Sequence, residues 1–545
     1  MLARFLATLL CVLPAFAASA ADWQSRSIYQ LVTDRFATSD GSSPTCNTSD
    51  RKYCGGTWKG IVNKLDYIQN MGFDAIWISP VVANLNGTTA YGEAFHGYWT
   101  QDLNSLNSNF GSADDLKSLA TELHKRGMYL MIDVVVNHVA SASNPPNYSI
   151  YPAPFNSQAS FHNETFIAAS DYDNNQTAVE QKWLGDTNLP LPDINTEDQN
   201  IVNTYKTWIA GLVSNYSADG IRIDTVKHVR KDFWPDFASS AGVYTIGEVL
   251  HNETSYVSAY TRKSGLFLNM NQALIRKLEV IDAVLDYPDW FVVTSGFQNN
   301  QGKLSTLVST YQESQKSYKN GTFYAGAFLE NHDQPRFQSL TQDQALVKNA
   351  MAWPFVGDSV PILYYGQEQG YTGGNDPANR EALWLSGYET DKPLVTHVQT
   401  LNAARKAAAV ANPSFYSTPA TFYSVTDDSF AVYKKPMLAL FSNKGAGTAP
   451  QWTIGDSIFD KNEALVDVLS CTSVNADGNG GINTQSSDGA PMVLLPASAL
   501  DKKGTLCSSL ASGSQASGAV PGVSFSMATL GVSLMVATFV ARVLA

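Results

Sequence analysis

The chain has 545 residues, of which 44 % are apolar and 11 % aromatic, so it can build a large hydrophobic core and is not globally disordered. It carries 36 Lys and Arg against 49 Asp and Glu, and the resulting net charge of −13 argues against a nucleic-acid partner. The length predicts several domains, or one large α/β barrel with attachments.

The N-terminus has the pattern of a secretory signal, which has to be set aside before the fold is considered. Arg4 supplies the positive start, residues 5–17 supply the apolar run, and residues 18–20 form a small-residue cleavage site. A membrane anchor is the alternative, but the run is too short to span a bilayer comfortably. We therefore expect residues 1–20 to be a signal peptide that is removed after Ala20.

From residue 27 to about residue 410, short apolar stretches alternate with amphipathic helical patterns such as 112–126 and 201–216. This alternation predicts a mainly parallel sheet. Eight β/α units in one chain favour a closed barrel over an open sheet. The candidate strands are 28–32, 75–79, 129–136, 220–223, 244–247, 283–285, 325–329 and 362–365.

Two intervals depart from the alternation. About 80 residues separate the third strand from the fourth, which is too long for a loop and predicts a small inserted domain at about 139–197. After about residue 413, short alternating runs such as 429–433, 437–441 and 492–495 predict an antiparallel β domain. The expected domains are thus a barrel over 21–415 and a β domain over 416–507.

The C-terminal residues have the order of a glycosylphosphatidylinositol (GPI) signal. A small, polar stretch at 508–517 is followed by a short spacer and an apolar run over 527–545 with no basic cluster after it. A plain transmembrane tail is the alternative. The attachment residue is ambiguous among three serines, of which we select the last, so that 518–545 would be removed: Ser512, Ser514 and Ser517.

The cysteines and glycosylation sequons agree with export. Cys11 lies in the signal, and of the other four a Cys46–Cys54 bridge would close a short loop and a Cys471–Cys507 bridge a longer one. No CxxC motif or Cys/His cluster indicates zinc. Eight N-x-S/T sequons predict that some glycosylation occurs, at Asn47, Asn86, Asn147, Asn163, Asn175, Asn215, Asn252 and Asn320.

Three acidic residues stand at the ends of predicted barrel strands. Asp224 and Glu248 follow the fourth and fifth strands, and Asp333 follows the seventh. Barrel enzymes place reactive groups at the C-terminal ends of their strands, so these carboxylates should meet at one mouth. A lone Asp at such a place is more often a cap or an ion-pair partner. Three together, with His, Arg and Lys at the same rim, indicate glycosidic bond cleavage.

Arg222 precedes Asp224 by two residues on the same predicted strand, so both side chains point to one face. We expect the guanidinium to favour the ionised form of Asp224. That makes Asp224 the better nucleophile and Glu248 the better acid.

The strings DVVVNH, GIRIDTVKH, GEV and FLENHD resemble, in order, the four sequence signatures of the α-amylase family of retaining glycosidases. AYGEAFHGYW, WLGDTNLPLPD and GGNDPANREALWLSGY resemble the secreted fungal α-amylases, and the resemblance covers about residues 22–507. It implies a (β/α)8 TIM barrel with a small domain B inserted after strand 3 and a C-terminal antiparallel β-sandwich, domain C.

The resemblance also implies roles for individual residues. Asp224 resembles the nucleophile, Glu248 the general acid/base, and Asp333 the carboxylate that stabilises the transition state. Without the motif, Trp99 would be interpreted as an ordinary core residue. The positions that resemble substrate-binding residues are His96, Tyr98 and Trp99 (donor platform), His138, Arg222 and His332 (cleavage site), Asp376 and Arg380 (donor clamp), and Lys227 and His228 (acceptor side).

A structural calcium ion between the barrel and domain B is implied in the same way. The matching oxygen donors come from Asn137, Glu180, Asp193 and the carbonyl of His228. The alternative is that Glu180 and Asp193 are solvated loop acids. Lys182 stands where relatives carry a cysteine, so a disulfide that would brace this site is missing.

These features predict an α-amylase that hydrolyses internal α-1,4 bonds of α-glucans with retention of configuration. A GPI-anchored 4-α-glucanotransferase that remodels wall α-glucan is the alternative, and it is favoured by the anchor and by an altered acceptor segment at 260–280. A catalytically inactive glucan-binding protein is disfavoured by the complete carboxylate triad. We expect a monomer that is held on the outer leaflet of the plasma membrane or in the cell wall.

Overall fold

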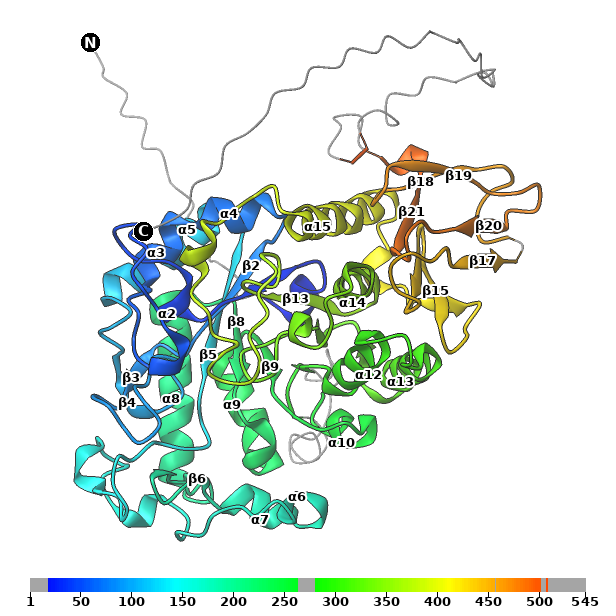
Figure 1. The fold of residues 1–545 in the computed structure, drawn as a ribbon. Helices are drawn as coiled ribbons and strands as arrows, with labels where there is room; N and C mark the ends of the chain where they lie inside the picture. The colour runs from blue at the N-terminus through cyan, green and yellow to red at the C-terminus, as the bar shows by residue number, and fades with distance from the viewer. Residues whose placement is uncertain (1–17, 263–279, 456, 501–505, 508–545) are drawn as a thin grey trace, which may run out of the picture.

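The computed structural model describes residues 18–262, 280–455, 457–500 and 506–507 (Figure 1). Within these ranges no helix combines the length and the apolar character needed to cross a membrane. Most of the predicted signal peptide, the predicted anchor signal with Ser517, and most of the altered acceptor segment at 260–280 lie outside the described residues.

Eight parallel strands form the barrel in the order β10-β9-β8-β5-β2-β1-β13-β12. A parallel bridge between Leu285 and Gly326 joins its two ends. A Cβ on Gly326 would lie 2.7 Å from Cδ1 of Ile362 and 2.8 Å from Cδ1 of Ile246, so the interior is closely packed around this glycine. The prediction of eight strands is confirmed, and they are β1 (Ile28–Gln30), β2 (Ala75–Ile78), β5 (Tyr129–Val134), β8 (Gly220–Ile223), β9 (Tyr244–Gly247), β10 (Ala283–Val284), β12 (Gly326–Phe328) and β13 (Val360–Tyr364).

Helices cover the outside of the barrel (Figure 1). In α5 (Ala113–Lys125), Ser112 and Asp115 form a capping box, and buried leucines at 116, 119 and 123 face the strands. The helix predicted over 112–126 is therefore confirmed, with Ser112 as its cap. The other long helices are α8 (Gln199–Tyr216), α9 (Trp234–Ala241), α12 (Tyr287–Phe297), α13 (Leu304–Ser317), α14 (Gln344–Val356) and α15 (Pro393–Ala411).

Two excursions rise from the carboxyl ends of the strands. After β2 the chain forms an antiparallel hairpin, β3 (Val82–Asn84) and β4 (Thr100–Leu106), which was not predicted. Between β5 and α8 lie two short helices, α6 (Asp171–Asn174) and α7 (Gln176–Gln181), and the hairpin of β6 (Leu184–Asp186) and β7 (Leu189–Leu191). These excursions form the walls above the barrel mouth.

The C-terminal β-sandwich is confirmed. A six-stranded antiparallel sheet, β14-β15-β16-β21-β18-β19, faces the two-stranded sheet β17-β20. Trp452 and Ile454 of β17 share a buried cluster with Leu438 and Leu440 of β16. The strands are β14 (Thr421–Tyr423), β15 (Ser429–Lys434), β16 (Met437–Ser442), β17 (Gln451–Ile454), β18 (Ala464–Asp467), β19 (Thr472–Asn475), β20 (Ile482–Gln485) and β21 (Met492–Pro496).

The sandwich packs against the barrel through polar and aromatic contacts. Lys434 on β15 donates to Asp358 at 2.5 Å, and both side chains are buried. Trp353 on α14 meets Phe430 and Phe441 edge-on at 5.6 and 5.9 Å. The predicted Cys46–Cys54 and Cys471–Cys507 disulfides are both present.

Candidate active site

A cavity of about 330 Å³ opens at the carboxyl ends of the barrel strands. The loops after β5, β8, β9, β12 and β13 bring together side chains that are far apart in the sequence. The structure thus gathers most of the predicted site residues, namely His96, Tyr98, Trp99, His138, Asp224, Glu248, His332, Asp333, Asp376 and Arg380.

Arg222 is a buried cation beside this cavity, in contact with two of the carboxylates that line it. Its Nη1 donates to Asp224 Oδ1 at 2.8 Å, and its Nη2 donates to Glu248 Oε2 at 2.9 Å. Nη1 also contacts both oxygens of Asp133 at 3.0 and 3.1 Å. The predicted contact with Asp224 is therefore present, but the guanidinium is shared among three acids. Because one guanidinium reaches both carboxylates, Asp224 and Glu248 must lie close together.

Asp133 was missing from the predicted site. It lies on β5, is buried, and accepts hydrogen bonds from Trp77 Nε1 at 3.0 Å and from Tyr98 Oη at 2.7 Å. Burial raises its pKa to about 6, although Arg222 opposes the rise. Asp133 thus fixes the orientation of both Arg222 and Tyr98 from below the cavity.

Burial also raises the pKa of Asp224, while Arg222 lowers it and the neighbouring Glu248 raises it further. At Asp333 burial again raises the pKa, against the lowering effect of Arg380. Burial thus favours the protonated forms of these acids, so Arg222 opposes but does not cancel the rise at Asp224, contrary to the expectation that it holds this residue ionised. A positive charge on an entering sugar ring would favour the ionised forms, because charges interact strongly in a site with little solvent. The site is suited to stabilise a positively charged sugar ring.

Burial disfavours the protonated forms of the histidines in the cavity. Burial lowers the pKa of His138 to about 4 and places that of His332 well below its ordinary value. Gln30 Nε2 lies 2.9 Å from His332 Nδ1, and His332 Nε2 lies 3.3 Å from Asp333 Oδ2. A neutral imidazole held in this way can donate a hydrogen bond to a sugar hydroxyl without adding charge.

Aromatic rings form a platform on one side of the cavity. The Tyr98 and His332 rings are stacked with centroids 5.0 Å apart and planes 5° apart. The His96 and Trp99 rings meet edge-on at 4.6 Å. Trp99 is half-buried and lines the cavity, as expected of a side chain that a sugar ring can pack against.

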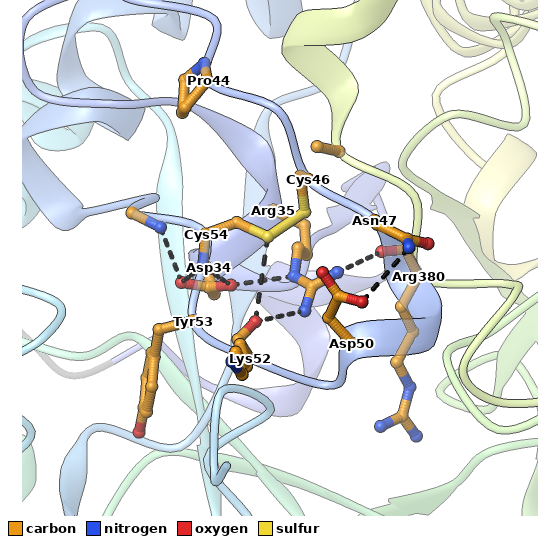
Figure 2. Close-up of a disulfide and its surroundings, with 12 residues drawn as sticks. Asp34, Arg35, Pro44, Cys46, Asn47, Asp50, Lys52, Tyr53, Cys54 and Arg380 are labelled. Carbon is orange, nitrogen blue, oxygen red and sulfur yellow. Dashed lines mark hydrogen bonds and ion pairs between the residues drawn. A yellow bond between two sulfur atoms is a disulfide. The ribbon is translucent and has the colours of Figure 1, made fainter. Parts of the chain in front are cut away.

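The Cys46–Cys54 loop supplies a residue that sequence analysis missed. Figure 2 shows Asp34 and Arg35 holding this loop, with Arg35 donating to the carbonyls of Lys52 and Arg380 at 2.8 and 3.0 Å. The loop presents Arg51, whose Nη1 donates to Asp376 at 2.7 Å. Arg380 contacts the same carboxylate at 3.1 Å. The predicted Asp376–Arg380 pair thus supplies two members of a three-residue clamp, and Arg51 is the third.

A second cleft, of about 460 Å³, adjoins the first. Thr225 and Glu248 line both, so Glu248 stands at the boundary between them. The predicted acceptor residues Lys227 and His228 lie in this second cleft. Its other lining residues are Tyr172, Asp173, Leu250 and His251, of which none was predicted.

The predicted calcium ligands lie behind the site, where the excursion after β5 meets the barrel. The Asn137 side-chain amide is 2.9 Å from both Asp193 Oδ1 and the carbonyl oxygen of His228. Glu180, by contrast, accepts from Gln176 Nε2 at 2.8 Å. Within the described ranges no group of three or more His, Cys, Asp or Glu side chains forms a metal centre. Three of the four predicted donors therefore converge, in a set dominated by amide and carbonyl groups.

His162 and Lys182 brace this region without a disulfide. His162 Nδ1 lies 2.6 Å from Asp193 Oδ2, and its Nε2 lies 2.8 Å from Glu197. Burial lowers the pKa of His162, but these hydrogen bonds raise it to about 9. Lys182 pairs with Asp171 at 2.9 Å.

Comparison with known proteins agrees with this architecture. The model of the α-amylase catalytic domain matches residues 30–416, and that of α-amylase domain C matches residues 422–515. α-Amylase 1 of Schwanniomyces occidentalis is 43% identical over 494 residues, covering 89% of this chain and 92% of its own. The α-amylase of Saccharomycopsis fibuligera is 42% identical over 478 residues, covering 87% of this chain and 92% of its own.

Solved structures give the same result. An α-amylase from Malbranchea cinnamomea superposes with a TM-score of 0.83 at 40% identity, covering 90% of this chain and 100% of its own. CldA, a cyclomaltodextrin glucanotransferase with a three-domain ABC distribution, has a TM-score of 0.71 at 25% identity, covering 86% of this chain and 98% of its own.

Proposed function

The chain belongs to the α-amylase family of glycoside hydrolases, and from that premise we propose that it cleaves internal α-1,4 bonds of α-glucans with retention of configuration. One observation carries the proposal: Glu248 stands at the boundary of the donor cavity and the acceptor cleft. A general acid must reach the glycosidic oxygen of the bond that is cleaved. In a substrate that occupies both the cavity and the cleft, this oxygen lies at the boundary between them.

In the proposed reaction, Asp224 attacks the anomeric carbon and Glu248 protonates the departing oxygen. The glucosyl–enzyme ester is then hydrolysed by a water that Glu248 deprotonates. A retaining mechanism needs its two carboxyl groups close together, and Arg222 contacts both of them at 2.8 and 2.9 Å. Asp333 is positioned by Arg380 at 3.4 Å to stabilise the sugar cation.

Calcium is proposed as a structural ion. Asn137, Asp193, Glu180 and the carbonyl of His228 would hold it, and the amide oxygen of Asn137 already faces Asp193 Oδ1 and the His228 carbonyl oxygen, as a ligand would. Burial raises the pKa of Asp193 to about 8, and a cation beside it would favour the ionised form. When bound, the ion would fasten the excursion after β5 to the barrel. It takes no part in bond cleavage.

Transfer to a sugar acceptor is the second candidate. The acceptor cleft offers Tyr172, with 41 % of its surface exposed, and His251, whose ring stacks on Tyr256 with centroids 4.3 Å apart. Both rings can hold an acceptor sugar. A glucanotransferase among the structural neighbours supports the same possibility.

Incubation with maltoheptaose separates the two candidates. Hydrolysis gives only shorter oligosaccharides, whereas transfer gives products longer than the substrate. We expect shorter products to dominate, because both cleavage-site histidines, His138 and His332, are present.

We further propose that the enzyme is anchored through Ser517 to a glycolipid on the outer face of the plasma membrane or passed from there into the wall. The support is the order of small, spacer and apolar residues over 508–545. Phosphatidylinositol-specific phospholipase C should release active enzyme from membranes, provided that the inositol is not acylated. A membrane-bound protein that still carries residues 527–545 by mass spectrometry would refute the anchor.

A further inference from the structure

Gln30 is a buried polar side chain that the reaction proposed above does not use. It lies on β1, which pairs with β2 and β13 in the barrel, and only 2 % of its surface is exposed. Burying an amide without full hydrogen bonding costs stability. Gln30 Oε1 has no partner among the described residues, whereas Nε2 lies 2.9 Å from Nδ1 of His332. This strand thus directs an amide at a histidine of the cleavage site.

The His332 ring is held between this amide and the catalytic mouth. Tyr98 stacks on the ring with planes 5° apart, and Trp77 meets it edge-on with centroids 6.3 Å apart. The aromatic packing fixes the ring plane, so each nitrogen keeps its own neighbour. Nδ1 faces Gln30, and Nε2 lies 3.3 Å from Oδ2 of Asp333.

These two neighbours decide which nitrogen carries the proton of the uncharged ring. Burial lowers the pKa of His332 well below its ordinary value, Arg380 and Arg222 lower it further, and Glu248 raises it, so the uncharged form is favoured. A carboxylate oxygen beside Nε2 favours a proton there, because an unprotonated nitrogen would turn its lone pair toward Asp333. Nδ1 is then left as an acceptor, and the amide NH2 at position 30 is the donor that it needs.

We propose that Gln30 is a positioning residue that fixes the tautomer of His332. Its Nε2–H donates to Nδ1, so the ring proton stays on Nε2, beside Asp333 in the donor cavity. An arriving sugar hydroxyl then meets a donor from His332 and an acceptor from Asp333. Without the amide, the other tautomer becomes accessible, and it presents a lone pair where the sugar needs a donor. This inference rests on the proposed function, because it assigns a role within the same reaction.

The tautomer can be measured without substrate. In the full chain labelled with [15N]histidine, a His332→Asn variant identifies the two ring nitrogens by their loss from the NMR spectrum. We expect Nδ1 to resonate as an unprotonated nitrogen and Nε2 as a protonated one. In Gln30→Met, which keeps the side-chain length but cannot donate, both resonances should shift toward a mixture of tautomers. A protonated Nδ1 in the parent, or unchanged resonances in Gln30→Met, would overturn the proposal.

A carboxyl group at position 30 tests the same contact by activity. When protonated it can donate to Nδ1 as the amide does, but when ionised it can only accept, which moves the ring proton to Nδ1. Relative to the parent, kcat/KM of Gln30→Glu should therefore fall at least about fivefold from pH 5 to pH 8, the effect of one hydrogen bond to the sugar. The ratio to the parent removes the titration of the other groups around the ring, namely Tyr98, His96, Arg222, Glu248, Asp333 and Arg380.

Gln338 provides a matched control. It is also a buried glutamine with an unpartnered amide atom among the described residues, and it lines neither the donor cavity nor the acceptor cleft. Gln338→Glu should follow the pH dependence of the parent when both are measured well below their melting temperatures. A ratio for Gln30→Glu as flat as that for Gln338→Glu would overturn the proposal. If the parent has the expected tautomer but does not cleave maltoheptaose, the proposed function is wrong and the tautomer assignment is not.

Discussion

The catalytic proposal depends on two carboxylates that one arginine holds together. Replacing either by its amide keeps the shape but removes the nucleophile or the acid. We expect Asp224→Asn and Glu248→Gln each to lower kcat/KM by at least ~10³-fold. The exposed Glu313 on α13 provides a control, because Glu313→Gln should leave activity unchanged.

Melting curves of the two amide variants should resemble that of the parent chain, which would show that the loss of activity does not come from a loss of folding. If either variant retains more than about a tenth of the parent activity, the role proposed for that residue is wrong.

Replacement of Arg51 tests whether the clamp of Arg51, Asp376 and Arg380 helps to bind the substrate. Its ion pair with Asp376 is about one-third exposed, and pairs of that kind contribute about 1 kcal/mol or less. Arg51→Ala should therefore raise KM for a long maltooligosaccharide up to about fivefold, with kcat nearly unchanged. For maltotriose, which is too short to fill the whole cleft, the effect should be smaller. A loss confined to kcat would show that Arg51 acts on the chemical step instead.

At the scale of elements, the start of α12 contains a buried acid pair. Asp286 accepts from Tyr318 at 2.7 Å and Asp289 accepts from Trp353 at 2.7 Å. One oxygen of each acid has no partner among the described residues. Burial raises the pKa of Asp286 to about 6 and that of Asp289 well above its ordinary range.

Because these pKa values are raised in the folded state, the folded chain binds more protons than the unfolded chain. Stability is then greatest at acid pH and falls as pH rises from about 4 through the folded pKa values. A group shifted by about two units loses about 3 kcal/mol over that window. Asp289→Asn should therefore lose less melting temperature between pH 5 and pH 8 than the parent. Parallel losses in the two proteins would contradict this.

The next prediction concerns calcium and the excursion after β5. Lys182 and Asp171 make a partly exposed ion pair in this segment, and such a pair contributes little to stability. A bound ion contributes about 4 kcal/mol at a thousandfold excess over its Kd. Chelation should lower the melting temperature of the parent, and Asp193→Ala should weaken the response to added calcium. An unchanged melting curve in excess chelator would contradict the proposed calcium site.

At the scale of the whole molecule, the barrel strands could be predicted because each is a short apolar run between helical patterns. The sandwich strands β15, β16 and β21 were predicted for a similar reason. The β3–β4 hairpin was not, because β4 is polar and carries no apolar alternation. A hydrogen bond from Trp208 on α8 to the carbonyl of Leu103 fastens β4 to the barrel, and no local pattern in β4 encodes it.

The site was predictable where it lies at strand ends and not where loops supply it. The spacing of Arg222 and Asp224 placed both on one face, but only the neighbouring strands show that Asp133 and Glu248 share the same guanidinium. Arg51 comes from a disulfide loop whose partner, Asp376, is 325 residues away. No sequence pattern near Arg51 or near Asp376 predicts that contact.

The measurement that tests the central claim most directly is the anomeric configuration of the first products released from maltoheptaose, followed by proton NMR before mutarotation. Attack by Asp224 followed by water assisted by Glu248 inverts the anomeric carbon twice, so the new reducing ends should appear as the α-anomer. Initial release of the β-anomer would mean a single displacement, and it would contradict the roles assigned to both carboxylates.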